Sequence, residues 1–211
     1  MKIEIDHLFK TIGKNQVLDD ICLTMEGGKI YGLKGKNGSG KTMLMRAIVG
    51  LIRPTSGSIY INDEKIGKDI SFPRSVGVLI ENPSFIRSFS GYRNLKALAD
   101  INERISENEI KEMIRLVGLN PDDKRPYRKY SLGMKQRLGI AAALMEKPEL
   151  ILLDEPINAL DEAGVKEIRD ILVSLKDENR IIIVACHDKE ELEFLSDEII
   201  EISEGRIVHT K

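Results

Sequence analysis

The chain has 211 residues, of which 42% are hydrophobic and 31% are charged, as in an ordinary globular protein. This length predicts one large domain, or a domain with an inserted subdomain, whose core needs no disulfide or metal. Its 32 basic and 34 acidic residues are interspersed, which excludes a basic nucleic-acid-binding arm. No apolar run approaches the ~20 residues of a membrane-spanning helix, and the alternating first residues do not resemble a signal peptide.

The first third of the chain has the pattern of strands. Apolar and charged residues alternate over residues 2–8, and segments 17–25 and 29–33 are rich in β-formers. A helix-like segment then covers residues 42–49 and ends near Gly50, a plausible helix C-terminus. Two further strands are predicted at residues 58–62 and 75–80.

The middle of the chain is helical and the last third returns to strands. Between about residues 91 and 145 the apolar period is that of helices; Ser106 and Glu109 predict a capping box, and Gly118 a helix end. Two buried parallel strands are then predicted at residues 150–153 and 181–186, with a helix at 162–176 between them. A hairpin of residues 198–203 and 206–208 closes the chain. The pattern predicts an α/β core interrupted by a helical insertion.

The two cysteines do not have the spacing of a metal site. Neither Cys22 nor Cys186 has a second cysteine two or three residues away. Both lie in apolar, strand-like segments, so we expect two buried, reduced thiols, which fits a reducing cytosol.

Residues 35–42 fit the phosphate-binding pattern G-x-x-x-x-G-K-[ST] at every fixed position. They follow an apolar strand and open a helix, which is the context that the pattern requires. Glycines let the backbone wrap around phosphate oxygens, while successive N–H groups and the helix N-terminus form an anion cradle. The candidate nucleotide-binding residues are Gly35, Lys36, Asn37, Gly38, Ser39, Gly40, Lys41 and Thr42.

Two residues of this segment bring chemistry beyond the backbone. Lys41 would place a positive charge at the β- and γ-phosphates, and the Thr42 hydroxyl is a hard ligand for Mg²⁺. A flexible Gly/Ser loop is the alternative, but it does not explain a Lys-Thr pair in register before an apolar helix. The pattern alone does not choose among a kinase, a GTPase, a motor and a transporter ATPase.

Asp154 and Glu155 come directly after the strand predicted at residues 150–153. In an open parallel sheet ligands bind beyond the carboxyl ends of strands, so both acids are expected to face the phosphate loop. Asp154 would hold Mg²⁺, and Glu155 would accept a proton from the attacking water. An acid capping the next helix is the plainer alternative.

Read together with these motifs, residues 130–137 resemble the signature of ATP-binding-cassette (ABC) ATPases, usually Leu-Ser-Gly-Gly-Gln followed by a Gln-Arg pair. The matching residues are Ser131, Gly133, Gln136 and Arg137, and the departures are Tyr130, Leu132 and Met134. A hydroxyl and a small residue at a helix N-terminus can approach a γ-phosphate. The resemblance covers nearly the whole chain. It implies one P-loop NTPase domain of the ABC type with an N-terminal antiparallel β part, a core of residues 1–85 and 147–211, and a helical subdomain of residues 86–146.

The resemblance also assigns roles to single residues. His187, after the strand at residues 181–186, looks like the switch histidine that contacts the γ-phosphate, so the implied catalytic set is Glu155, His187 and Lys41. Residues 158–161 look like the loop that couples two nucleotide sites across a dimer. His7 and His209 do not follow a predicted strand of the nucleotide site in this way, and we expect them to have no role in it.

Two departures from the family pattern matter. Glu81 stands where the family usually has Gln; it resembles the exporters of bacitracin and lantibiotic self-protection, and the implied metal set is Thr42, Glu81 and Asp154. Ile12 replaces the aromatic residue that usually stacks on adenine, and offers apolar contact without a π-face. Phe85, Phe89 and Tyr92 either form the groove for a membrane subunit's helix or pack inside the helical insertion; both alternatives stay open.

The resemblance implies an ATP-binding and ATP-hydrolysing subunit that powers transport, in the direction of export, through a separate integral membrane permease. Two copies would close head to tail, each ATP and Mg²⁺ lying between one phosphate loop and Ser131 and Gly133 of the other copy. The expected location is cytoplasmic, on the inner face of the cell membrane, and no nucleic-acid partner is expected. A soluble ABC ATPase for assembly or nucleic-acid work is the alternative. The intact Asp154-Glu155 pair disfavours a module that only binds nucleotide, and the absent Asn-Lys-x-Asp guanine reader disfavours a GTPase.

Overall fold

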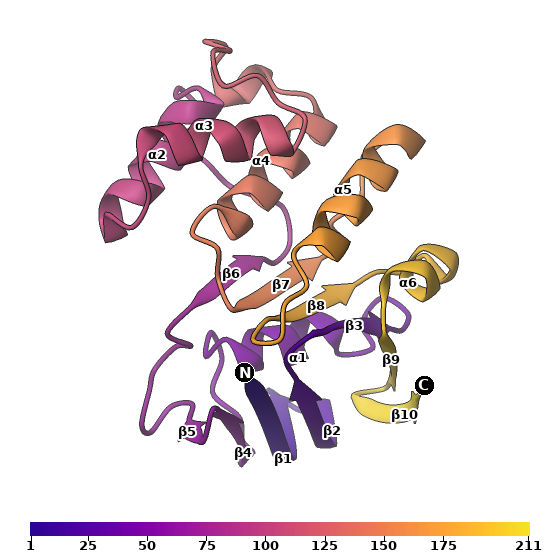
Figure 1. Ribbon diagram of the computed structural model, residues 1–211. Coiled ribbons are helices and arrows are strands. Elements are labelled where there is room, and N and C mark those ends of the chain that lie inside the picture. The colour runs from indigo at the N-terminus through magenta and orange to yellow at the C-terminus, as the bar shows by residue number, and fades with distance from the viewer.

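The computed structural model describes residues 1–211 and contains two β-sheets with one helix between them and the other helices beyond the six-stranded sheet (Figure 1). The four-stranded sheet is antiparallel and has the order β2-β1-β4-β5, from Asn15–Glu26, Lys2–Ile12, Ser56–Ile61 and Glu64–Lys65. The six-stranded sheet has the order β10-β9-β3-β8-β7-β6, from Arg206–Thr210, Glu198–Ser203, Lys29–Lys34, Ile181–Ala185, Leu150–Asp154 and Val76–Leu79. Its strands are parallel except β10, which forms the predicted hairpin with β9.

The six-stranded sheet separates two hydrophobic cores. Successive side chains of a strand point to opposite faces, and β7 and β8 are buried on both. On β7, Leu150 and Leu152 face one core, while Ile151 and Leu153 face the other. This explains why these strands are continuous apolar runs in the sequence.

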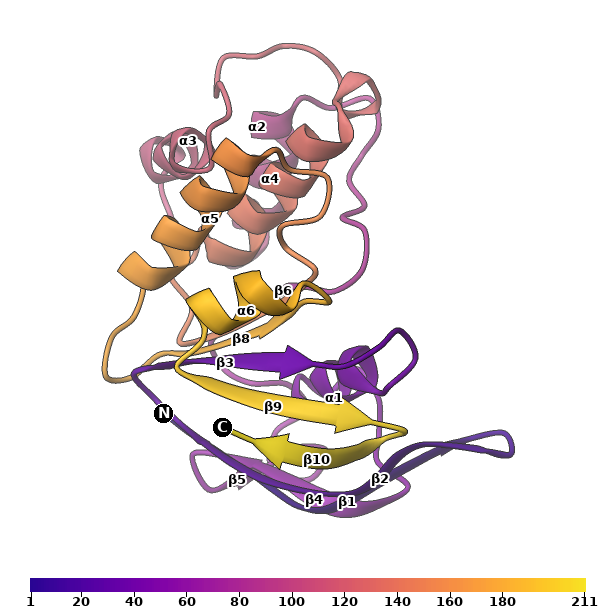
Figure 2. The ribbon, with the colours of Figure 1, turned by 90° about the vertical axis from the view of Figure 1, so that its right-hand side faces the viewer.

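Helix α1 (Lys41–Ile48) fills the space between the two sheets. Its buried Leu44, Met45 and Ile48 share a core with Ile3 of β1 and Leu33 of β3. Figure 2 shows the six-stranded sheet with the four-stranded sheet on one side and the other helices on the opposite side. The packing fixes the start of α1, and with it the phosphate loop, at the carboxyl end of β3.

The remaining helices lie beyond the opposite face of the sheet and are α2 (Gly91–Asn102), α3 (Glu107–Leu116), α4 (Leu132–Leu144), α5 (Glu162–Ser174) and α6 (Lys189–Leu195). Helices α2 and α3 pack on α4 rather than on the strands. The capping box at the start of α3 is confirmed: the Ser106 hydroxyl accepts from the Glu109 N–H, and the Glu109 carboxylate accepts from the Ser106 N–H. The α/β class and the antiparallel N-terminal part are as predicted. The domain boundaries at 85/86 and 146/147 stay a prediction.

Helix α4 lies unusually close to β6. A Cβ atom placed on Gly77 would lie 1.8 Å from the backbone oxygen of Ala143, so only glycine fits there. Because α4 carries the signature-like residues, this contact ties their position to the central sheet.

The aromatic residues after Glu81 pack partly inward. Phe85 contacts the ring of Tyr127 edge-on, with centroids 5.3 Å apart, and both Phe85 and Tyr92 lie against the helical core. Phe89 instead carries the Arg93 guanidinium over its ring, 4.1 Å from the centroid. Phe85 and Tyr92 are thus partly buried in the helical part of the chain, and the groove for a membrane subunit's helix stays a prediction.

The prediction of two buried thiols is wrong for Cys22. Cys186 is buried, but Cys22 is exposed, because Ile21 and Met25 of β2 face the core and Cys22 is out of phase with them. The apolar neighbours of Cys22 in sequence concealed this alternation. None of the helices reaches the length and hydropathy that crossing a membrane requires.

Candidate nucleotide-binding site

A cavity of about 550 Å³ opens where the phosphate loop, β7 and the segment after β6 meet. Its lining is mostly polar and consists of Val17, residues 37–43, Glu81, Asn82, Gln136, Asp154, Glu155 and Asn158. The carboxyl ends of the parallel strands converge here, as expected for a ligand site in an open α/β sheet.

The phosphate loop is built for an anion. Gly40 is the N-cap of α1 with a φ of 114°, a backbone conformation that L side chains rarely adopt, and no side chain caps this helix. The first N–H groups of α1 are thus left for a ligand. The Ser39 hydroxyl is buried without a hydrogen-bond partner, an unusual cost that a bound phosphate oxygen would remove.

Lys41 is held inside this loop. Its side chain is 6% exposed, and its Nζ donates to the Gly35 carbonyl at 2.6 Å and the Lys36 carbonyl at 3.2 Å. A buried ammonium with only carbonyl partners is an incompletely compensated charge. The phosphate groups of a nucleotide supply the missing countercharge.

Thr42 and Asp154 form the candidate metal-binding pair. The Thr42 hydroxyl donates to the Asp154 carboxylate at 2.6 Å, from the first turn of α1 to the end of β7. Burial raises the pKa of Asp154, and the neighbouring Glu155 raises it further, although the Thr42 hydrogen bond acts in the opposite direction. A hydroxyl and a carboxylate are hard oxygen ligands, so this pair fits Mg²⁺.

Glu155 and His187 meet at the ends of neighbouring strands. In the register of β7 and β8, Asp154 lies opposite Ala185, and the Glu155 N–H donates to the Ala185 carbonyl at 2.8 Å. This brings His187 Nδ1 to 2.7 Å from Glu155 Oε2. The backbone of Glu155 has a φ of 52°, a left-handed conformation that turns its side chain toward the cavity.

Gln136 is a site residue that sequence reasoning did not select. The sequence marks it only as part of the signature match, yet it is buried, lines the cavity and donates from Nε2 to the Glu155 carbonyl at 2.9 Å. It links α4 directly to the end of β7. Its burial depends on contacts far apart in the chain, which sequence pattern does not report.

Glu81 lines the cavity but is held at its edge. Its carboxylate pairs with the Arg46 guanidinium of α1 at 2.5 Å, and its backbone is left-handed with a φ of 62°. The acid is therefore near the Thr42–Asp154 pair without hydrogen bonding to either.

Six predicted site residues do not line this cavity. Gly35, Lys36 and His187 line an adjacent one, which shares Asn37, Glu155 and Asn158 with it. The other three are Ile12, Ser131 and Gly133. Ile12 lies at the tip of the β1–β2 hairpin, 50% exposed, and Val17 of β2 borders the cavity instead. Ser131 is the exposed N-cap of α4, where its hydroxyl accepts from the Met134 N–H at 3.2 Å. Gly133 follows it; a Cβ there would lie 2.9 Å from a backbone oxygen of the 158–161 segment.

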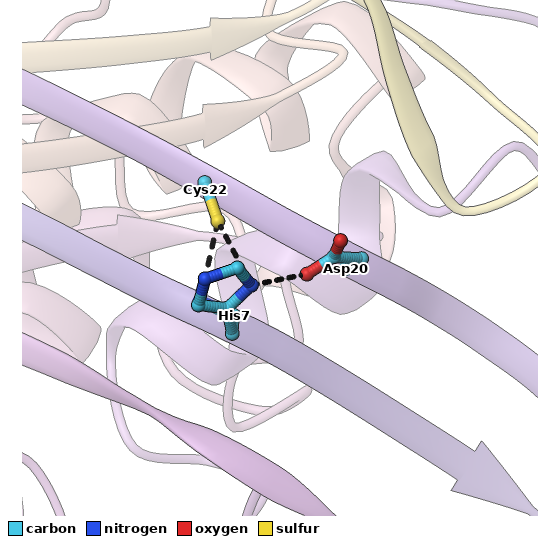
Figure 3. Close-up of side chains that lie close together, drawn as sticks. All are labelled: His7, Asp20 and Cys22. Carbon is cyan, nitrogen blue, oxygen red and sulfur yellow. Dashed lines mark hydrogen bonds and ion pairs between the residues drawn. The ribbon is translucent and has the colours of Figure 1, made fainter.

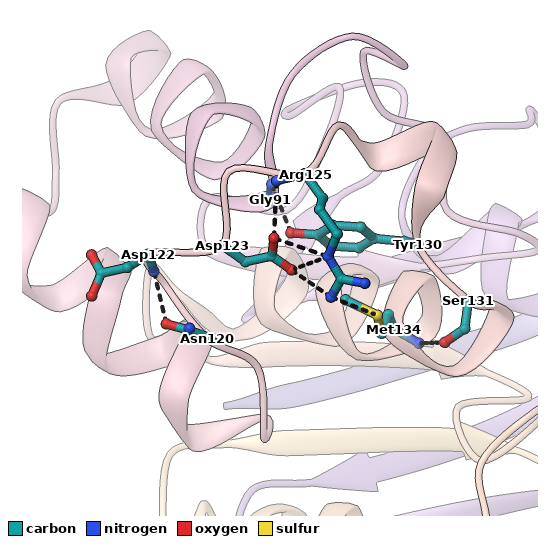
Figure 4. Close-up of polar contacts among 8 residues, drawn as sticks. All are labelled: Gly91, Asn120, Asp122, Asp123, Arg125, Tyr130, Ser131 and Met134. Atoms are coloured by element: carbon teal, nitrogen blue, oxygen red, sulfur yellow. Dashed lines mark hydrogen bonds and ion pairs between the residues drawn. The ribbon is translucent and has the colours of Figure 1, made fainter.

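The segment before α4 is braced by polar contacts (Figure 4). Arg125 pairs with Asp123 at 2.7 Å and reaches the sulfur of Met134 at 3.8 Å, and Arg125 lowers the pKa of Asp123. The Tyr130 hydroxyl accepts from the Gly91 N–H at 3.1 Å. Ser131 is consequently presented from a fixed backbone.

The comparisons with known proteins agree with this geometry. The family model described as ABC transporter matches residues 18–158. An uncharacterized ABC transporter ATP-binding protein of Bacillus subtilis, YybJ, is 50% identical over 97% of this chain and 94% of its own. The lantibiotic transport ATP-binding protein SrtF of Streptococcus pyogenes is 40% identical over 99% and 90%, and the bacitracin transport ATP-binding protein BcrA of Enterococcus faecalis is 41% identical over 98% and 68%.

Solved structures show the same fold. The ATP-binding cassette MJ0796, in a dimeric post-hydrolysis state with ADP and Pi, superposes with a TM-score of 0.88 at 21% identity, over 99% of this chain and 97% of that one. The cassette fold predicted from the sequence is thereby confirmed. The family model matches two thirds of this chain, and relatives match nearly all of it. The chain therefore belongs to the ABC transporter family, as one of its ATP-binding ATPase subunits.

Proposed function

We propose that this subunit hydrolyses ATP in a head-to-tail homodimer and powers export through a separate integral membrane permease. The observation that carries the proposal is the Glu155–His187 pair beside a phosphate loop with an unpartnered buried hydroxyl. A proton acceptor and an anion cradle thus face one cavity.

Within one chain, the loop of residues 35–42 binds the phosphates through its backbone N–H groups, and Lys41 turns its ammonium from loop carbonyls to the β- and γ-phosphates. Thr42 and Asp154 would hold Mg²⁺, with Glu81 beside them once its pairing with Arg46 opens. When bound, Mg²⁺ offsets the negative charge of the phosphates.

Glu155 serves as general base. It accepts one proton from a water molecule while the water oxygen bonds to the γ-phosphorus and the bond from that phosphorus to the bridging oxygen breaks. The products are ADP and inorganic phosphate. His187 orients the Glu155 carboxylate through its Nδ1. Its other nitrogen is then available to a γ-phosphate.

A second copy completes the site. Ser131 and Gly133 lie outside the cavity of their own chain, at the exposed start of α4, where a hydroxyl and helix N–H groups can meet a γ-phosphate bound to another copy. A similar cassette has been solved as a dimer. Val17, at the border of the cavity, provides apolar contact for the adenine. Ile12 lies outside the cavity and stays a predicted adenine contact.

The names of the relatives suggest the cargo. SrtF and BcrA are named as lantibiotic and bacitracin transport proteins, and both align over nearly this whole chain. We therefore propose export of a peptide or lipid-like antibiotic, with the subunit at the cytoplasmic face of the cell membrane. The alternative of a soluble ABC ATPase is not favoured, because these relatives are transport proteins.

Two measurements test this function. The Glu155→Gln protein should sediment as a dimer when ATP and Mg²⁺ are present and as a monomer without nucleotide. The double variant Glu155→Gln, Ser131→Arg should still bind ATP but stay monomeric. In addition, tagged wild-type protein should recover an integral membrane protein from detergent-solubilised membranes. A monomer at saturating ATP contradicts the dimeric site, and recovery of ribosomes or DNA alone contradicts the transport role.

A further inference from the structure

His7, Asp20 and Cys22 form a side-chain cluster on the exposed face of the four-stranded sheet (Figure 3). His7 Nδ1 lies 2.6 Å from Asp20 Oδ1 and 3.6 Å from Cys22 Sγ. A nitrogen, an oxygen and a sulfur ligand atom thus all lie within 4.8 Å of one another. None of the three residues lines the nucleotide cavity.

A bulge in β1 brings His7 to this face. Ile5 pairs with Leu23 and Leu8 pairs with Ile21, so two residues of β1 lie opposite the single residue Cys22. Strict alternation would place His7 on the inner face with Ile5, but its φ of 43° turns it outward and Leu8 resumes the buried phase.

A second bulge, in β2, brings Asp20 to the same face. Leu8 pairs with Ile21 and Lys10 with Leu18, so two residues of β2 lie opposite one residue of β1. Asp20 also has a left-handed backbone, with a φ of 56°. The two bulges, one in each strand, therefore converge three chemically different donors on one point.

The sulfur of Cys22 lies beside both the backbone and the ring of His7. The His7 backbone N–H donates to Cys22 Sγ at 3.4 Å. The Nδ1 atom of the His7 imidazole lies 3.6 Å from the same sulfur. Cysteine binds metals as the thiolate, and a bound metal ion itself displaces the thiol proton. Thiolate, imidazole and carboxylate together are the ligand set of Zn²⁺.

The distances fit a tetrahedral ion. With Zn–S of about 2.3 Å and Zn–N of about 2.0–2.1 Å, tetrahedral ligands place sulfur and nitrogen about 3.6 Å apart; the Cys22–His7 distance is 3.6 Å. The Asp20 oxygen must withdraw from its hydrogen bond with His7 by less than about 1 Å, again judged from these bond lengths. Its side chain is 54% exposed and free to do so.

We propose that His7, Asp20 and Cys22 form a Zn²⁺ site, with water as the fourth ligand, that ties β1 to β2. The competing account is a solvated His7–Asp20 ion pair beside an idle thiol. The two accounts differ in what Zn²⁺ does to the protein. This site is independent of the proposed ATPase cycle, because its residues lie outside the cavity.

The test is titration of the full chain with Co²⁺ and then Zn²⁺, without nucleotide or Mg²⁺. Wild type should bind one Co²⁺ per chain with a thiolate-to-cobalt charge-transfer band, which Zn²⁺ displaces. Cys22→Ser should lose the band. Asp20→Asn and His7→Gln should weaken Zn²⁺ binding by at least the roughly 10–100-fold that even outer-shell changes cost. Zn²⁺ should raise the melting temperature of wild type and not of Cys22→Ser.

Two control variants separate this site from others. Cys186→Ala should keep the band, although Cys186 lies with Glu155 and His187 in a second group of possible ligands. His209→Gln removes another exposed histidine and should change nothing. The proposal is overturned if wild type shows no thiolate band, or if the band survives Cys22→Ser and disappears in Cys186→Ala. Circular dichroism confirms that each variant is folded. If Cys22→Ser does not fold, the loss of Zn²⁺ binding in His7→Gln and Asp20→Asn tests the site instead.

Discussion

His187 Nδ1 lies 2.7 Å from Glu155 Oε2, although the two residues are 32 positions apart in sequence. The parallel register of β7 and β8 creates this contact, since each residue follows the end of its strand. The same carboxylate faces the nucleotide cavity. The proposed base is thus already in contact with a histidine, beside the phosphate loop, before nucleotide binds.

Replacing the proposed base should separate binding from turnover. Glu155→Gln keeps the hydrogen-bonding shape but cannot accept the proton, so ATP hydrolysis should fall by about 10²–10⁴-fold while ATP affinity is retained. Steady-state phosphate release and equilibrium nucleotide binding measure the two quantities. Glu162→Gln, an exposed acid at the start of α5, is the matched control. Normal turnover by Glu155→Gln would refute the assigned role.

Lys41 and Lys36 provide a matched pair in the phosphate loop. Lys41→Ala removes the buried ammonium and should weaken ATP binding by about 1.5–3 kcal/mol, or about 10–150-fold, as expected for hydrogen bonds to a charged group. Lys36→Ala changes an exposed side chain and should have little effect. Titration with a fluorescent ATP analogue gives both affinities; equal losses would contradict the assignment to Lys41.

The ionised carboxylate of Asp154 should lower the free energy of unfolding when no ligand is bound. Burial raises its pKa in the folded state, so the folded chain holds its proton to higher pH than the unfolded chain. Stability therefore falls as pH rises from the ordinary aspartate range to the raised pKa, and stays lower above it. At neutral pH, Asp154→Asn should melt at a higher temperature than wild type without nucleotide. It should also lose the Mg²⁺-dependent part of the stabilisation by ATP, measured by thermal denaturation with and without Mg²⁺.

Gly77 should tolerate no side chain. Gly77→Ala drives a Cβ into the Ala143 carbonyl of α4, so it should lower the free energy of unfolding by about 1–3 kcal/mol, the usual range for overpacking. Gly67→Ala is the comparison, because that site has open space and only a positive φ of 83°. Urea denaturation should rank Gly77→Ala as the more damaging change; the reverse order would show that α4 can move away from β6.

Much of the fold could be predicted because its signals are local. The continuous apolar runs of β7 and β8 and the Ser106–Glu109 capping box each lie within a few residues. Cys22 was mispredicted because its burial depends on the phase of β2 relative to the core, and apolar neighbours in sequence do not reveal that phase. The bulge that turns His7 outward likewise depends on pairing between strands.

The site residues also differ in whether a local sequence pattern marks them. Residues 35–42 and the Asp154-Glu155 pair were found because each motif is contiguous and stands at a strand end. Val17 and Gln136 reach the cavity from distant elements, and no local pattern marks them. The pairing of Glu81 with Arg46 depends on how the segment after β6 lies along α1, which the sequence does not encode locally.

The outward position of Ser131 has a genetic consequence. Each pocket of the proposed dimer borrows its serine from the neighbouring molecule, so damage to Ser131 in one subunit disables the pocket whose phosphate loop belongs to the other. A mixed pair carrying a Ser131 defect in one subunit and a Lys41 defect in the other concentrates both lesions in a single pocket. The second pocket keeps both its serine and its lysine, so the mixed dimer retains one complete nucleotide site.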